Sequence, residues 1–128
     1  MTNSTYDIIG IGIGPFNLGL AALCEPVEEI KALFLDQKSQ FHWHPGLLLE
    51  NTSLQVPFLA DLVTMAAPCS KYSFLNYLKA QSRLYNFYFL EKLHISRREY
   101  NHYCQWGGRT ITQLSVWRKS RSHFLGRK

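Results

Sequence analysis

A glycine-rich turn between two short apolar segments constrains the fold of this chain more than any other feature. Residues 6–11 are apolar except for Asp7, and such a short apolar run is typical of a buried strand. Gly12 and Gly14 follow it directly, and an apolar stretch that predicts a helix then runs to Leu23. A second apolar run, at residues 32–35, predicts a second strand. This order of elements predicts a βαβ unit and therefore an α/β fold.

The turn reads Gly12-x-Gly14-x-x-Asn17 and opens the predicted helix, which is the arrangement that binds the pyrophosphate of a dinucleotide. The first glycine permits the turn, the second lets the backbone approach the phosphates, and the helix N-terminus offers free N–H groups. Asp36, after the second predicted strand, suits a ribose hydroxyl. Asn17 weakens the generic match, because Gly or Ala is usual there. We therefore predict an adenine dinucleotide site, with a glycine turn that binds no ligand as the alternative.

The segment that follows Asp36 carries aromatic and histidine side chains. His42 and His44 have the spacing of a metal pair, but no third ligand stands nearby, so we expect no metal site. Because the segment follows a dinucleotide turn, Trp43 and His44 are well placed to pack against a cofactor ring. A plain packing role for these two side chains is the alternative.

The remainder of the chain is expected to be irregular and then helical. Residues 37–67 read as irregular, and apolar spacing predicts a helix within residues 73–84. Ser96 and Glu99 form a capping box that opens a helix, which is expected to end at Trp106 because two glycines follow. Met65, Trp106 and the aromatic residues at 85–89 are expected in the core. The cysteines are expected to be inert thiols, buried or half-buried: Cys24, Cys69 and Cys104.

The positive charge of the chain lies at one end. Residues 1–106 hold 8 of the 14 Lys and Arg residues and all 9 acidic residues, so their formal charge is −1. The other 6 basic residues lie in residues 107–128, without an acidic residue. Three cysteines with no CxxC pair favour a reducing cytoplasm. We expect no nucleic acid partner and no membrane span, since the apolar run at 8–24 is broken by glycines and a proline.

Four motifs in order then give a resemblance to a known family. They read YDIIGIGIGPFNLGLAAL, FLDQKSQFHWHPGLLL, LQVPFLADLVT and YSFLNYL. These stretches resemble the N-terminal part of the lysine/ornithine N-monooxygenases, the flavoprotein oxidoreductases that N-hydroxylate amines in siderophore biosynthesis and so serve iron acquisition. The sequence is most similar to members that use diamines. Asn17 departs from the Gly or Ala that is usual at this position of dinucleotide-binding turns, but it is the residue that this family tends to use there.

The resemblance implies an incomplete, Rossmann-like FAD-binding domain in a cytoplasmic, homo-oligomeric parent enzyme. That enzyme would use NADPH and O2 to hydroxylate a small amine, with the NADPH site outside this sequence. No side chain here needs to act as an acid or base, because the oxygen chemistry belongs to the flavin. The implied FAD-binding residues are Gly12, Gly14, Pro15, Asn17, Asp36, Gln37, Lys38, Trp43, His44 and Gln55.

One departure from the family pattern concerns the substrate. Family members that hydroxylate amino acids carry a lysine at the position of Ala60, and that lysine pairs with the substrate carboxylate. Ala60 cannot pair with it, and an unpaired carboxylate in a closed site would be costly. The resemblance therefore implies a decarboxylated amine such as putrescine, cadaverine or histamine, with L-lysine or L-ornithine as the alternative.

The resemblance ends at Trp106. We therefore expect a partial FAD-binding domain at residues 1–106 and a basic tail at 107–128 that is foreign to the family and that a frameshift would explain. A genuine basic tail that binds an acidic partner is the competing interpretation. The chain by itself is expected to be inactive and poorly soluble. Other possible functions are a non-catalytic FAD- or nucleotide-binding module and an anion-binding protein.

Overall fold

A computed structural model describes residues 5–112 and residue 114. Strand β1 (Ile8–Ile11) leads through the glycine turn into helix α1 (Pro15–Cys24), and the chain returns as strand β2 (Ala32–Leu35). The strands are parallel and in register, with Ile8 opposite Ala32 and Ile11 opposite Leu35. The predicted βαβ unit and the incomplete Rossmann-like α/β fold are confirmed.

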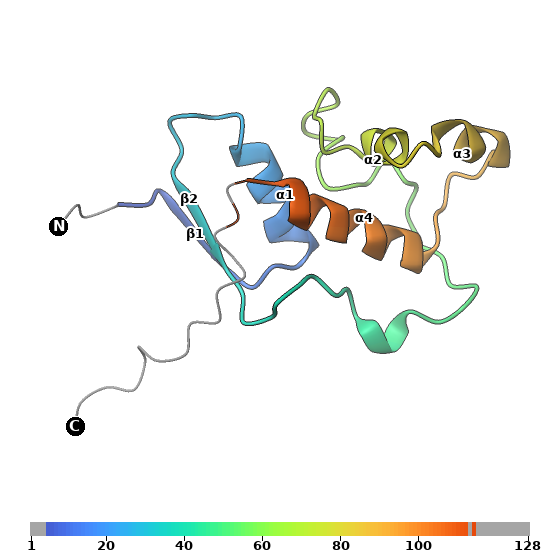
Figure 1. Cartoon of the computed structure of the whole chain (residues 1–128), viewed down its shortest axis with the longest axis horizontal. Helices are drawn as coiled ribbons and strands as arrows, with labels where there is room; N and C mark the ends of the chain where they lie inside the picture. The colour runs from blue at the N-terminus through green and yellow to red at the C-terminus, as the bar shows by residue number, and fades with distance from the viewer. Residues whose placement is uncertain (1–4, 113, 115–128) are drawn as a thin grey trace.

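The helices all lie to one side of the small sheet, with α1 next to the strands (Figure 1). Helix α1 contacts both β2 and helix α4 (Arg97–Thr110), and α4 also contacts helix α2 (Phe74–Ala80). Helix α2 leads into helix α3 (Leu84–Leu90), and both lie at the end of the molecule away from the sheet (Figure 1). A 3₁₀ turn, Pro45–Leu47, interrupts the irregular segment after β2.

The core forms where α1, α2 and α4 meet. Its large, fully buried side chains come from all of these helices, from β2 and from the loop before α2: Leu18, Phe34, Val63, Phe74, Leu78, Tyr103 and Cys104. Serine side chains cap the N-termini of α2 and α4. Ser73 Oγ accepts from the Asn76 N–H, and Ser96 Oγ accepts from the Glu99 N–H, each at 3.1 Å. The sequence had indicated the second of these caps.

Helix α4 is longer than the sequence predicts. It runs past Trp106 to Thr110 and includes two buried glycines, Gly107 and Gly108. A helical glycine is unfavourable by only about 1 kcal/mol relative to alanine, and tertiary packing offsets that cost. Gly107 lies against the side chains of Leu62 and Leu18, so the helix end is held by the core. The expected end at Trp106 was therefore wrong.

The first residues of the basic segment belong to the packed structure. Ile111 is buried, Leu114 packs against the core, and the Thr112 N–H donates to Glu25 Oε1 at 3.2 Å. Residues 113 and 115–128 lie outside the described residues. The boundary at 106 and the frameshift therefore stay predictions.

Several residues expected in the core or at half-buried positions are exposed instead. Met65 is 82% exposed, and Cys69 is also exposed. The aromatic group of α3 is exposed too, at Tyr85, Tyr88 and Phe89. Helix α3 is apolar around most of its circumference, but only its Leu84 and Phe87 side packs on the core. An apolar composition alone did not show which side is covered.

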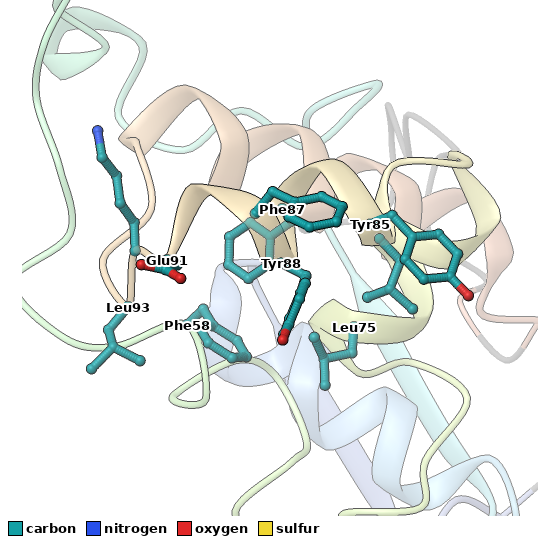
Figure 2. Close-up of a pocket in the computed structure, with 10 residues that line it drawn as sticks. Phe58, Leu75, Tyr85, Phe87, Tyr88, Glu91 and Leu93 are labelled. Atoms are coloured by element: carbon teal, nitrogen blue, oxygen red, sulfur yellow. The ribbon is translucent and has the colours of Figure 1, made fainter.

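The exposed aromatic side chains of α3 border an apolar pocket. Phe58, Leu75 and Tyr88 line this pocket together (Figure 2). Trp106 packs against the core as a partly buried residue, and Cys24 and Cys104 are buried as expected. No helix in the described part of the chain is long and apolar enough to span a membrane.

Candidate functional site

The glycine turn leaves open space at the N-terminus of α1. Gly12 adopts a φ of +82°, which only glycine adopts readily, and a side chain at Gly12 or Gly14 would meet no heavy atom within 4 Å. Gly14 is the N-cap of α1, and no side chain caps this helix end. The N–H groups of the first turn and the positive end of the helix dipole are therefore available to an anion.

Asp36 connects the end of β2 to this turn. Its Oδ2 accepts from the Ile13 N–H at 2.7 Å, and its Oδ1 accepts from the Lys38 N–H at 2.9 Å. Burial acts to raise the pKa of the Asp36 carboxyl, but these backbone donors outweigh burial and lower the pKa. The group is therefore ionised at neutral pH. Each oxygen keeps a lone pair that can accept from a ribose hydroxyl.

Asn17 ties helix α1 to the turn. Its Nδ2 donates to the Gly12 carbonyl at 2.6 Å, a bond that the usual Gly or Ala at this position could not make. The close packing expected of that position occurs elsewhere. A side chain at Gly10 would collide with the Phe34 ring, and one at Gly19 would lie 2.7 Å from the Leu62 carbonyl oxygen. Neither glycine was singled out from the sequence, because each meets a residue distant along the chain.

A second part of the site is an apolar pocket of about 650 Å³ beside α1. Four predicted site residues line it together: Pro15, Trp43, His44 and Ala60. Ala60 is exposed at its surface, and the Ala60 N–H donates to the Pro57 carbonyl at 2.9 Å. The remaining lining residues include Phe16, Leu20, Leu54, Val56 and Tyr100.

Among the described lining residues of this pocket, Asp61 alone has a carboxylate, and both of its oxygens already accept hydrogen bonds. Oδ1 accepts from the Val63 and Thr64 N–H groups, and Oδ2 from the Thr64 hydroxyl and the Phe74 N–H, all between 2.6 and 2.9 Å. Asp61 therefore holds its own loop against α2. Among the residues that the structure describes, no Lys or Arg lines the pocket, so a ligand carboxylate would meet neither of these cations there.

The remaining predicted residues lie around these two parts of the site. Gln37, Lys38 and Gln55 are exposed, and none of them lines the pocket. Lys38 contacts Asp36 through its backbone, and Gln55 lies between two lining residues. In the part of the chain that the structure describes, no cluster of three His, Cys, Asp or Glu side chains could hold a metal ion.

These features define an incomplete Rossmann-like α/β domain, with an uncapped helix N-terminus and an apolar pocket beside the same helix. The family model of the L-lysine 6-monooxygenases/L-ornithine 5-monooxygenases matches residues 4–120. The chain belongs to this family, as the four motifs had indicated.

Curated relatives agree with this assignment. The chain is 56% identical over 110 residues to a putrescine N-hydroxylase from Shewanella oneidensis, covering 86% of this chain and 22% of the relative. It is 42% identical to an L-lysine N6-monooxygenase from Escherichia coli, covering 86% of this chain and 26% of that protein. The greater similarity to a diamine-using member is thus confirmed. The chain spans about a quarter of the length of these relatives.

Solved structures agree as well. A cadaverine monooxygenase of the desferrioxamine pathway from Erwinia amylovora, bound to FAD, matches with a TM-score of 0.87 and 54% identity. That match covers 89% of this chain and 27% of the other. An ornithine N-hydroxylase from Kutzneria, with reduced FAD, NADP+ and L-ornithine, has a TM-score of 0.82 and 35% identity, and covers 88% of this chain and 27% of that chain.

Proposed function

We propose that this chain is the FAD-binding N-terminal segment of an NADPH-dependent amine N-hydroxylating monooxygenase of siderophore biosynthesis. The observation that carries the proposal is the open glycine turn at the uncapped start of α1, with the ionised Asp36 beside it. Relatives named for putrescine and cadaverine, one of them bound to FAD, support it.

The described residues fit FAD at two places, the glycine turn and the apolar pocket. The turn from Gly12 to Gly14 and the first N–H groups of α1 would hold the pyrophosphate, where added side chains would fill the space that phosphate oxygens need. Asp36, with the adjoining Gln37 and Lys38, would hold the adenosine ribose. The pocket beyond Pro15 would accept a flat ring against Trp43 and His44, with Gln55 at its edge.

The protein and the cofactor have separate roles in this proposal. Bound FAD, reduced by NADPH, supplies the oxygen chemistry. The described residues bind and orient the cofactor, and the apolar lining of the pocket excludes water. No side chain of this segment serves as an acid or base in the proposal, so no catalytic residue is assigned to it.

We infer that the substrate of the whole enzyme is a decarboxylated amine such as putrescine, cadaverine or histamine. Ala60 offers no charge, and none of the described residues that line the pocket is a Lys or Arg. A carboxylate brought there would lose its hydration without gaining a partner. L-Lysine and L-ornithine are therefore the less favoured substrates.

FAD binding is tested on the 128-residue chain by titration with FAD, followed by flavin fluorescence. Asp36→Asn removes the charge that the ribose needs, and we expect the Kd for FAD to rise about tenfold or more. Asp7→Asn is the matched control, because Asp7 also accepts a backbone N–H beside a strand, from Lys31 at 2.9 Å, but lies outside the site. Equal FAD affinity of all three chains, or no binding by the unsubstituted chain, would contradict the proposal.

The substrate class is tested by turnover. A full-length protein that contains this sequence should hydroxylate cadaverine faster than L-lysine, and Ala60→Lys should shift the preference toward L-lysine by supplying the missing cation. Faster use of L-lysine by the unsubstituted enzyme would refute the inference. The 128-residue chain alone, given FAD, NADPH and putrescine, is expected to form no hydroxylamine. Product formation by that chain would show that these residues suffice.

A further inference from the structure

Helix α4 presents three polar side chains, four residues apart, to the segment that lines the pocket. Gln105 Nε2 donates to the Phe41 carbonyl at 3.1 Å, and Asn101 Oδ1 accepts from the Trp43 N–H at 2.8 Å. The Arg97 guanidinium lies 5.1 Å from the centre of the Trp43 ring. Residues spaced by four share one face of a helix, so a single face of α4 contacts this segment along its length.

Asn101 occupies a buried position, where an amide side chain is energetically unfavourable without a hydrogen-bond partner. Only 5% of the residue is exposed, and a buried amide is unfavourable unless it is hydrogen-bonded. Its partner, the Trp43 N–H, is 58 residues away along the chain. The bond therefore does not stabilise helix α4 locally. It fixes the backbone of a distant loop.

That loop backbone is in a strained conformation at the next residue. His44 has a φ of +44° and a ψ of +64°, in the left-handed region, and it precedes Pro45. Left-handed conformations of non-glycine residues cost about 1 kcal/mol or more and persist only where the surrounding structure holds them. Two contacts of the preceding residue, Trp43, hold the His44 backbone from one side. They are the hydrogen bond from the Trp43 N–H to Asn101 and the edge-to-face contact of the Trp43 and Tyr100 rings, whose centres are 4.9 Å apart.

The first residue of the same helix, and Ile95 just before its N-cap, also hold the second segment of the pocket. The Leu54 N–H donates to the Ile95 carbonyl at 2.9 Å, and the Arg97 N–H donates to the Thr52 carbonyl at 3.0 Å. Gln55 follows directly. Two separate loops with predicted cofactor-binding residues therefore take their positions from one helix.

We infer that Asn101 is a positioning residue that holds Trp43 and His44 in the conformation that receives FAD. The inference rests on the proposed function, since it takes the Trp43–His44 segment as part of the FAD site. Asn101 itself does not line the pocket, so its effect would be carried by the Trp43 backbone. Gln105 and Arg97, one helical turn to either side of Asn101, hold the same loop through the Phe41 carbonyl and the Trp43 ring.

The test compares Asn101→Ala, Asn101→Asp and the unsubstituted 128-residue chain. Asn86→Ala is the matched control, because it makes the same change at an exposed position on α3. Two measurements are made on each chain: the Kd for FAD, by flavin fluorescence, and amide hydrogen exchange at Trp43 without FAD, by NMR. Far-UV circular dichroism confirms that each variant is folded.

We expect Asn101→Ala to weaken FAD binding about tenfold and to speed exchange at the Trp43 amide by a similar factor. Asn101→Asp keeps an acceptor and should restore most of both. Unchanged exchange in a folded Asn101→Ala chain overturns the inference, as does faster exchange with unchanged FAD affinity. If the unsubstituted chain binds no FAD, the proposed function fails, and the exchange measurement alone then decides whether Asn101 holds the loop.

Discussion

Gly19 and Gly107 both face Leu62, one from α1 and one from α4, but what each meets there is different. A Cβ at Gly19 would lie 2.7 Å from the Leu62 carbonyl oxygen, which is backbone and cannot move aside. A Cβ at Gly107 would lie 3.4 Å from a Leu62 methyl group, an ordinary contact with a side chain. The same substitution should therefore have opposite effects at the two positions.

We expect Gly19→Ala to lower the free energy of unfolding by about 2 kcal/mol or more, since α1 must separate from the Leu62 backbone. Gly107→Ala should raise it by about 0.5–1 kcal/mol, because alanine is the better helix former and fits the space. Urea unfolding followed by circular dichroism measures both. Equal destabilisation by the two substitutions would show that α4 approaches Leu62 as tightly as α1 does.

At the scale of the elements, Glu99 joins α4 to the α2–α3 pair. Its carboxylate accepts two hydrogen bonds from the Arg83 guanidinium, at 2.9 and 2.8 Å, and one from the Tyr77 hydroxyl at 2.9 Å. Burial acts to raise the pKa of Glu99, but these donors outweigh burial and lower the pKa. Burial and the Glu99 charge raise the pKa of Tyr77 to about 12.

The pH dependence of stability follows from the lowered pKa of Glu99. A carboxyl group whose pKa is lower in the folded chain stabilises it above the unfolded value of about 4.3, and this stability is lost as the pH falls through the folded value. Glu99→Gln should therefore lower the free energy of unfolding at pH 7 by about 1 kcal/mol, a value reduced because Arg83 is partly exposed.

The matched control for Glu99→Gln is Glu50→Gln. Glu50 lies 3.7 Å from Arg98, and its side chain is 79% exposed. Exposed ion pairs contribute little, so this substitution should leave unfolding at pH 7 nearly unchanged. Urea unfolding at pH 7 and pH 3 checks both variants. A difference between Glu99→Gln and the unsubstituted chain that is the same at both pH values would contradict the assignment.

At the scale of the whole molecule, a large apolar surface is exposed. It includes the outer side of α3, at Tyr85, Tyr88 and Phe89, and, separately, one face of the sheet, at Ile9 and Ile11. Apolar patches larger than a few hundred Å² favour self-association in soluble proteins. The exposed surface therefore explains why we expect the 128-residue chain to be poorly soluble.

Polar substitution on α3 tests this origin of poor solubility. Tyr88→Ser with Phe89→Ser should lower self-association, measured by light scattering, and leave the melting temperature within a few degrees, because neither side chain is in the core. Phe74→Ser, which affects a fully buried ring, is the contrasting variant and should unfold the chain. Unchanged scattering in the double variant would place the cause elsewhere, with the exposed face of the sheet at Ile9 and Ile11 as the next candidate.

The basic segment at 107–128 is also a feature of the whole molecule. We propose that a frameshift after the Trp106 codon accounts for its 6 basic residues without an acidic one. The nucleotide sequence tests this directly. A single-base change should restore a long reading frame that resembles the family, and the absence of any such frame would exclude the proposal.

The sequence by itself determined the βαβ unit, the glycine turn, the Ser96 cap and the family. These features depend on residues close together along the chain, where apolar periodicity and the conformational freedom of Gly12 act locally. It also placed Trp43, His44 and Ala60 among the site residues, and the structure brings these three into one pocket. Their roles toward FAD and substrate stay predictions.

Only the tertiary structure decided which surfaces are covered and what holds the loops. Helix α4 continues through Gly107 because Leu62 and Leu18 pack against it. Of the α3 aromatic residues, Phe87 packs on the core, whereas Tyr85, Tyr88 and Phe89 are exposed because the described residues leave their side of the helix uncovered. Asn101 contacts Trp43 from 58 residues away. A local pattern records that a residue is apolar or polar, but its partner is set by how distant segments pack, and that information exists only in the folded chain.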